Sequence, residues 1–120
     1  MKLSLESKSG AVFPIGVTTW CRVLQLATAY GWMLELTEAP RGWTGEEWDG
    51  TYISKSGQGV RASDAAALAR ALDGFLLDDE RKILKSSTTV HGSTALWAPR
   101  HKLLVKKAAD FCRQGFFRVN

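Results

Sequence analysis

Four side chains in the sequence could ligate a metal ion or act as a nucleophile and its base: Cys21, His91, His101 and Cys112. None of them has a second ligand at the short spacing that zinc motifs require. His101 and Cys112 fall on one expected helix eleven residues apart, roughly 16 Å at 1.5 Å per residue, which is too far for a shared metal or a catalytic pair. We therefore predict no metal site and no cofactor, with Cys112 in the core. Cys21 with His91 is the one thiol and base pair that stays open.

A glycine motif precedes the second of the expected helices. Residues 57–62 (GQGVRA) match the GxGxxG/A pattern of dinucleotide-binding proteins, and Asp78 and Asp79 follow about twenty residues later. In those proteins the helix begins inside the motif, so that its N-terminus meets the pyrophosphate. Here Ser63 has the properties of the helix cap, so we interpret the glycines as a hairpin turn. Because GxSxG, HExxH and P-loop motifs do not occur either, we expect that the protein is not an enzyme.

The tryptophans point to a different kind of site. Two of the five lie in residues 37–51, a long stretch rich in glycine and acidic residues and without helical or strand periodicity. Long loops in compact domains are often functional, and an aromatic side chain on a loop can anchor a protein interface. The acidic residues would repel nucleic acid. We predict a partner-binding site at Trp43, Glu46, Glu47, Trp48 and Asp49; the alternative is that at least one tryptophan folds back onto the domain.

The positive charge is concentrated in the last third of the chain. From residue 81 onward there are nine basic side chains and one acid, whereas residues 1–80 have seven basic and eleven acidic side chains. On the expected third helix, three basic residues fall within about 40° of one another and a fourth lies to one side. Such a face can contact phosphate, an acidic protein or only solvent, and all three interpretations stay open. The candidate residues are Lys102, Lys106, Lys107 and Arg113.

Several elements must position these residues. Residues 1–16 predict a β-hairpin, because Leu3 and Leu5 alternate with polar residues and residues 7–10 (SKSG) have turn-forming composition. Pro14 limits the second strand of this hairpin to a sheet edge. The same tetrapeptide recurs at residues 54–57, between Tyr52-Ile53 and Gly59-Val60-Arg61, and predicts a second hairpin. A ββα unit used twice in the chain therefore stays open.

Helices are expected where apolar residues recur at helical spacing. The first follows a cap at Thr18 or Thr19 and ends at Gly31, with an apolar face of Trp20, Val23, Leu24, Ala27 and Tyr30. The second follows a cap at Ser63, with Asp64 in its first turn, where a negative charge favours the helix dipole. Its apolar face consists of Ala65, Leu68, Ala69, Leu72, Phe75 and Leu76.

The remaining elements complete the expected chain path. Residues 78–80 end the second helix, and residues 86–98 predict a loop or a weak strand. A third helix runs from Pro99 or Arg100 to Gln114, followed by a final strand over residues 116–119. Its inward residues are Leu104, Ala108, Phe111 and Cys112, and Gly115 stops it.

These elements predict one globular domain over residues 1–120, with an α+β fold in which about three helices pack on a small, mainly antiparallel sheet. No apolar run approaches the roughly 18 residues that a membrane span needs, and the N-terminal residues do not resemble a secretory signal. The two cysteines lie far apart in the sequence, so we expect no disulfide and a cytoplasmic location.

Residues 24–32 (LQLATAYGW) are similar to the LxxLAxxYGW-type helix end of a family of small bacterial proteins that lack an assigned activity. The segment of residues 111–116 (FCRQGF) resembles the FCRxGxF-type C-terminal segment of the same family. The resemblance implies one shared fold and no particular reaction or ligand.

Together, these features predict a non-catalytic bacterial protein-binding module, such as an immunity protein that neutralises a toxin or an adaptor that regulates an enzyme. Two separated regions of opposite charge suit electrostatically steered association. The alternative is weak, largely sequence-nonspecific nucleic-acid binding through the basic third helix.

Overall fold

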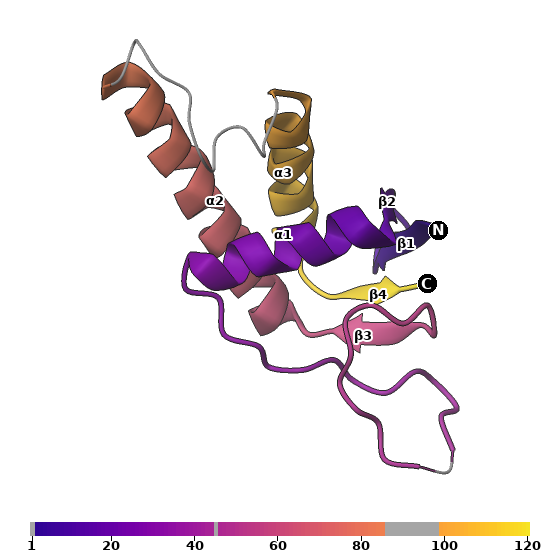
Figure 1. Cartoon of the computed structure of the whole chain (residues 1–120). Coiled ribbons are helices and arrows are strands. Elements are labelled where there is room, and N and C mark those ends of the chain that lie inside the picture. The colour runs from indigo at the N-terminus through magenta and orange to yellow at the C-terminus, as the bar shows by residue number, and fades with distance from the viewer. Residues whose placement is uncertain (1, 45, 86–98) are drawn as a thin grey trace.

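The computed structural model describes residues 2–44, 46–85 and 99–120, with the backbone alone for residues 79–85 and 99–101. It confirms the α+β class. A four-stranded antiparallel sheet has the strand order β2-β1-β4-β3, and three helices accompany it (Figure 1). The strands are β1 (Lys2–Ser7), β2 (Val12–Gly16), β3 (Gln58–Val60) and β4 (Phe117–Val119). The helices are α1 (Val17–Ala29), α2 (Ala62–Lys85) and α3 (Pro99–Cys112).

The N-terminal hairpin forms as predicted. Leu3 pairs with Ile15 and Ser4 with Pro14 across β1 and β2. On its other side, Ser4 exchanges two backbone hydrogen bonds with Asn120, at 2.9 and 2.8 Å. In an antiparallel sheet the N–H and C=O of one residue point toward the same neighbouring strand. The groups of Ser4 point toward Asn120, so its partner Pro14 points its backbone nitrogen, which lacks a hydrogen, away from β1. The prediction of an edge strand at Pro14 is confirmed.

The predicted second hairpin is wrong. β3 pairs with β4, with Gln58 opposite Val119 and Val60 opposite Phe117, and Tyr52-Ile53 is not a strand. On its other side, β3 makes an isolated bridge from Gly59 to Glu38. A strand next to the aromatic and β-branched residues of β4 gains more packing than the local turn could provide. The chain therefore has one ββα unit, not two.

The glycine motif serves packing inside β3. A Cβ atom at Gly59 would lie 2.7 and 2.8 Å from two ring carbons of Phe116, which is closer than van der Waals contact allows. Gly57 adopts a φ of 86° before the strand begins, and its N–H donates to the carbonyl of Val119 at 2.8 Å. The glycines are therefore explained by a positive φ before the strand and by a ring lying on the strand, and their interpretation as a hairpin turn is wrong.

The three helices form where the apolar spacing predicts them, but their starts differ. α1 begins at Val17 with Gly16 as its N-cap, so the predicted cap at Thr18 or Thr19 is wrong. α2 begins at Ala62, which places Ser63 inside the helix. At the other end, Gly31 adopts the predicted left-handed conformation with a φ of 95°.

α2 continues to Lys85 and does not end at residues 78–80 as predicted. Residues 81–85 (RKILK) contain neither glycine nor proline, and most of them are good helix formers that allow the helix to continue past the acidic residues. Residues 86–98, predicted as a loop or a weak strand, lie outside the described residues. α3 and β4 have the predicted order, with Gly115 between them at a φ of 106°.

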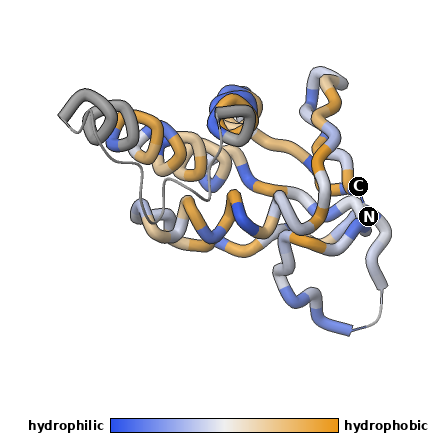
Figure 2. The backbone as a smooth tube through the Cα atoms, turned by 45° about the horizontal axis from the view of Figure 1, so that its top comes forward, coloured by the Kyte–Doolittle hydropathy of each residue, from blue (hydrophilic) through white to orange (hydrophobic). Residues whose placement is uncertain are grey.

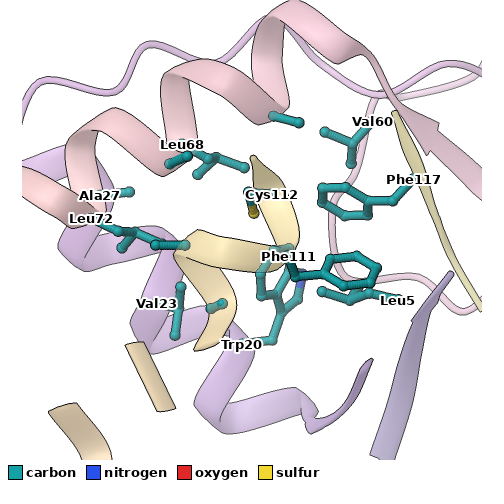
Figure 3. Packing of buried hydrophobic residues seen from close by; sticks show 14 of the residues in the cluster. Leu5, Trp20, Val23, Ala27, Val60, Leu68, Leu72, Phe111, Cys112 and Phe117 are labelled. Carbon is teal, nitrogen blue, oxygen red and sulfur yellow. The ribbon is translucent and has the colours of Figure 1, made fainter. Parts of the chain in front are cut away.

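One face of the sheet is covered by the helices. Leu3 and Leu5 are buried in β1, while Lys2 and Glu6 on the opposite face are exposed. Figure 3 shows this core, in which Phe117 of β4 lies against Phe111 of α3 with ring centroids 5.5 Å apart. The core also contains the predicted inward residues of all three helices except Leu24, Tyr30, Leu76 and Leu104, which are partly buried.

The described helices contain no stretch that is long and apolar enough to cross a lipid bilayer. The chain between α1 and β3 is the largest part without regular secondary structure in the described residues. Figure 2 shows its loop projecting away from the helices and the sheet. We call residues 33–53 the 33–53 segment.

Candidate functional site

The 33–53 segment concentrates exposed apolar side chains. In the described part of the chain eight large hydrophobic residues are exposed, and five of them lie in this segment: Met33, Leu34, Leu36, Trp43 and Ile53. Single exposed hydrophobic residues are normal on protein surfaces, whereas several in one region indicate an interaction site. The segment also has five carboxylates and one arginine, so its surface is both apolar and acidic.

The two loop tryptophans pack against each other. Their ring centroids are 5.0 Å apart at an angle of 76°. The indole N–H of Trp43 donates to the carbonyl of Glu46 at 2.7 Å, and that of Trp48 donates to the hydroxyl of Thr37 at 3.0 Å. Trp48 is half-buried, as the fold-back alternative expects of at least one tryptophan, and Trp43 is 45% exposed. The pair is thus an ordered aromatic projection with one ring accessible.

The structure places the other predicted partner-binding residues beside this pair. Glu46, Glu47 and Asp49 are all exposed. The carboxylate of Asp49 accepts a hydrogen bond from the backbone N–H of Thr51 at 3.1 Å, which orders the turn after Trp48. The five predicted residues therefore belong to one loop, in which the three exposed acidic residues are close to Trp48 in the sequence.

A buried polar cluster lies beneath the segment, and the sequence analysis did not predict it. Both oxygens of the Asp64 carboxyl accept hydrogen bonds, one from the Trp32 indole N–H at 2.7 Å and one from the Tyr52 hydroxyl. Asp64 is completely buried. The rings of Trp32 and Tyr52 meet edge to face, with centroids 5.2 Å apart. The cluster thus joins the end of α1, the 33–53 segment and the first turn of α2.

Burial changes the acidity of this cluster. Loss of hydration raises the pKa of Asp64, while the hydrogen bonds from Tyr52 and Trp32 oppose that rise. Burial, together with the hydrogen bond to Asp64, also raises the pKa of the Tyr52 hydroxyl. The Tyr52 hydroxyl therefore stays protonated and donates a hydrogen bond to the Asp64 carboxyl.

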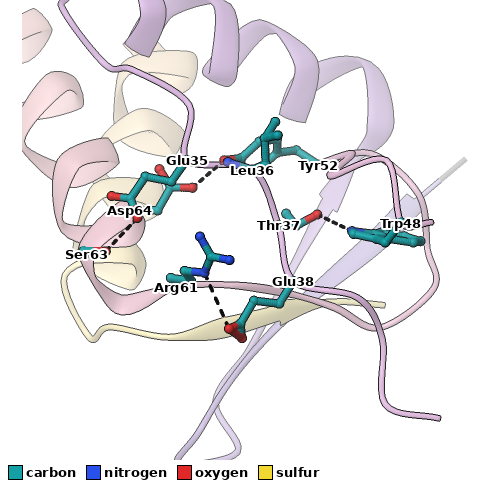
Figure 4. A network of polar contacts seen from close by, with 9 residues as sticks. All are labelled: Glu35, Leu36, Thr37, Glu38, Trp48, Tyr52, Arg61, Ser63 and Asp64. Atoms are coloured by element: carbon teal, nitrogen blue, oxygen red, sulfur yellow. Dashed lines mark hydrogen bonds and ion pairs between the residues drawn. The ribbon is translucent and has the colours of Figure 1, made fainter. Parts of the chain in front are cut away.

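Leu36 is held in an unusual backbone conformation above this cluster. Its φ is 71°, and it is the one non-glycine residue with a positive φ among the described residues. This left-handed conformation costs an L-residue about 1–2 kcal/mol. The backbone N–H of Leu36 donates to the Tyr52 hydroxyl at 2.9 Å, as Figure 4 shows. Its side chain occupies the space in which a Cβ atom at Gly50 would have to lie, 2.7 Å from the Leu36 Cβ.

Two exposed contacts connect the 33–53 segment to the start of α2 (Figure 4). The Ser63 hydroxyl donates to Glu35 at 2.8 Å, and the guanidinium of Arg61 lies 3.5 Å from the carboxylate of Glu38. The predicted capping role of Ser63 is therefore replaced by a contact to a different part of the chain. Asp64 lies in the first turn of α2 as predicted, but its partners are buried side chains.

The basic candidates on α3 do not form one uniform surface. Lys106 and Lys107 are exposed, and Lys102 is partly buried. Arg113 follows the helix and forms ion pairs with Asp73 of α2 and Asp110 of α3. These hydrogen bonds raise the pKa of the Arg113 guanidinium further above its ordinary value. Arg113 is thus partly neutralised by its own domain, beside an open groove of about 390 Å³ that residues of α2 and Arg113 line.

The cysteines differ in accessibility. Cys112 is buried in the core as predicted, and burial raises the pKa of its thiol to about 12. Cys21 is partly exposed. His91 and the side chain of His101 lie outside what the structure describes. Within the described residues, no three His, Cys, Asp or Glu side chains are grouped closely enough to hold a metal ion.

Comparison with protein-family models, with curated proteins and with solved structures finds no match to this chain. The resemblance of residues 24–32 and 111–116 to a bacterial family stays a prediction.

Proposed function

We propose that this protein is a non-catalytic protein-binding module and that the 33–53 segment is its interaction face. The observation that carries the proposal is the concentration of exposed apolar side chains in a segment that is also rich in carboxylates. Met33 is 81% exposed and Trp43 is 45% exposed. Exposed aromatic and large apolar residues are typical of anchors that a partner covers.

The buried titratable groups support a role in binding and not in catalysis. Both carboxyl oxygens of Asp64 accept hydrogen bonds from neighbouring side chains, and the residue is shielded from solvent. The thiol of Cys112 is also buried and keeps its proton at neutral pH. A general base or a nucleophile must reach its substrate, and these two groups do not reach the surface.

A bacterial immunity protein or a regulatory adaptor is the biological role that we favour. Either would act by covering part of another protein, for which one ordered face is sufficient. The carboxylates of Glu46, Glu47 and Asp49 would accelerate association with a positively charged partner through long-range attraction.

Weak, largely sequence-nonspecific nucleic-acid binding through α3 is the competing proposal. It depends on Lys106 and Lys107, which are exposed. Arg113 contributes less to it than the sequence indicates, because two carboxylates already pair with its guanidinium. Binding of phosphate weakens as salt rises, and so does binding of a cationic partner to carboxylates. Nuclease treatment therefore separates the two proposals, because it removes nucleic acid and leaves a protein partner in place.

A tagged pull-down from the lysate of the native host tests the proposal, with nuclease-treated and untreated halves at low and high salt. We expect a stoichiometric protein partner that survives nuclease. Trp43→Ala should weaken its binding by at least about tenfold, equivalent to 1.4 kcal/mol. The free energy of unfolding should stay nearly unchanged, because the exposed Trp43 ring packs on Trp48 within the loop.

Leu77→Ala is the matched control, since Leu77 is a large apolar residue on α2 that is 55% exposed. Equal affinity of the wild type and Trp43→Ala would remove the loop from the interface. Recovery of nucleic acid alone, lost at high salt and in Lys106→Glu, would replace the proposal with the nucleic-acid alternative.

A further inference from the structure

Three consecutive backbone N–H groups hold residues 36–38 to three other places in the chain. That of Leu36 donates to the Tyr52 hydroxyl at 2.9 Å, and that of Thr37 to the carbonyl of Gly50 at 3.2 Å. Glu38 exchanges two hydrogen bonds with Gly59 of β3, at 2.7 and 3.0 Å. The backbone of this short stretch is therefore fixed before any partner arrives.

The side chain of Leu36 is 50% exposed on top of this fixed backbone. A left-handed leucine costs free energy, and the exposed half of its side chain does not recover it by burial in the folded protein. Strained, well-supported residues of this kind are common at binding sites, because a fixed anchor loses less conformational entropy on association. Leu36 thus has the properties of an anchor that is prepared for a partner.

The charge of the 33–53 segment limits the chemistry of that partner. The 33–53 segment has five carboxylates and one arginine, whereas the whole chain has a net charge of +4. Glu46, Glu47 and Asp49 are exposed beside the tryptophans. A segment that exposes both carboxylates and apolar side chains favours a partner with apolar side chains flanked by lysine or arginine.

We propose that the 33–53 segment binds a cationic, amphipathic segment of a partner protein, with Leu36 as the apolar anchor and Tyr52 as the residue that positions it. This inference rests on the proposed function and adds to it the chemistry of the partner. The apolar side of the partner segment covers Leu36 and the accessible Trp43 ring. Its basic side chains face the carboxylates of the loop.

Selection from a random peptide library displayed on yeast tests the chemistry of the partner. The purified wild-type chain is the only bait, and Leu36→Ala is used afterwards to test the selected peptides. We expect the selected peptides to carry a net positive charge and to place apolar residues on one side. Their affinity should fall as the salt concentration rises. Selection of neutral or acidic peptides, or of peptides that bind Leu36→Ala equally well, would overturn the proposal.

Titration calorimetry with one selected peptide tests the anchor. Leu36→Ala should weaken binding about tenfold, whereas Leu77→Ala, which removes an equally exposed leucine from α2, should leave it unchanged. Alanine keeps a Cβ, so the backbone strain at position 36 is the same in the wild type and in Leu36→Ala. Equal effects of the two substitutions would show that Leu36 is not an anchor.

A double-mutant cycle tests the positioning role of Tyr52. Tyr52→Phe keeps the ring beside Trp32 and removes the hydroxyl that holds the Leu36 N–H. It should weaken peptide binding severalfold in the wild type and have little further effect in Leu36→Ala. A hydroxyl with a merely structural role would weaken binding by the same factor in both backgrounds, which would overturn the assignment.

The outcome for the native partner separates this inference from the proposed function. If Trp43→Ala weakens partner binding but the selected peptides are not basic, the binding face stands and the cationic partner is wrong. If neither Trp43→Ala nor Leu36→Ala changes binding, both are wrong. A dimer in sedimentation equilibrium that is lost in Leu36→Ala would place a second copy of the chain on this face and overturn the inference.

Discussion

Asp64 and Asp73 lie on the same helix and both contact donors from distant parts of the chain, yet their surroundings are opposite. Asp64 is completely buried and accepts hydrogen bonds from Trp32 and Tyr52. Asp73 pairs with Arg113 at the surface, where the side chains are 39% and 48% exposed. Water competes with Arg113 for the exposed carboxylate of Asp73. It cannot replace the buried hydrogen bonds of Asp64 to Trp32 and Tyr52. The same residue type should therefore differ severalfold in its contribution to stability.

The two contacts also organise different parts of the molecule. The cluster at Asp64 connects the end of α1, the 33–53 segment and the start of α2, so the proposed interaction face depends on it. The ion pairs of Arg113 connect α2 with the end of α3, far from that face in the sequence. Substitutions at Asp64 should therefore disturb both stability and binding, whereas substitutions at Asp73 should disturb neither strongly.

Asp64→Ala should have the largest effect. It leaves the Trp32 indole N–H and the Tyr52 hydroxyl without their acceptor in a buried site, and each such group costs about 1–3 kcal/mol. We expect a loss of about 4 kcal/mol in the free energy of unfolding, measured by urea denaturation. Ser63→Ala, which changes the preceding residue and its exposed contact to Glu35, is the control and should lose less than about 1 kcal/mol. Similar losses for the two proteins would contradict the contrast between buried and exposed contacts.

The stability contributed by Asp64 should also depend on pH. Burial raises the pKa of its carboxyl above the ordinary value of 3.8, so the native state binds the proton more tightly than the unfolded state does. The contribution is then complete below the unfolded pKa and falls as the pH rises through the native pKa. Urea denaturation at a series of pH values should show the wild type losing stability relative to Asp64→Asn in this range. An advantage of the wild type that grows with pH would mean that the native pKa is lowered.

Asp73→Asn should have the smallest effect. Its partner Arg113 is exposed and keeps the second ion pair to Asp110, and surface ion pairs contribute about 0–1 kcal/mol. Thermal unfolding should therefore change by no more than a few degrees, and the difference from the wild type should shrink further in high salt. A loss as large as that of Asp64→Ala would show that this contact is not a simple surface ion pair.

Much of the architecture follows from local patterns in the sequence. Alternation and turn composition predicted β1 and β2, and helical spacing predicted the buried faces of α1, α2 and α3. Gly31 marked the end of α1 correctly, whereas α3 ends at Cys112, before the predicted end at Gln114. The error at the second hairpin has a clear cause. Tyr52-Ile53 and β3 each look like a strand, but the sequence does not show that β4 is a better neighbour for β3.

The candidate site was predicted in part. The loop around Trp43 and Trp48 stood out by its composition, and the structure brings these residues together. Leu36 and Tyr52 were missed. No local sequence pattern indicates that a leucine adopts a left-handed conformation, or which residues a tyrosine hydroxyl will contact. Asp64 carried a usable signal: it precedes Leu68 and Leu72 by four and eight residues and so lies on the buried side of α2. It had been interpreted only as a first-turn acid.

The local pattern of residue types along the chain was sufficient to predict the α+β class, the buried faces of the helices and the contrast between an acidic and a basic region. These properties depend on backbone periodicity and composition, which act over a few neighbouring residues. The pairing of β3 with β4, the enclosure of Asp64 by Trp32 and Tyr52, and the neutralisation of Arg113 by Asp73 required the folded chain. Each joins residues that are far apart in sequence, and such contacts form only when the whole core closes, because their partners are selected by packing and by the need to satisfy buried polar groups.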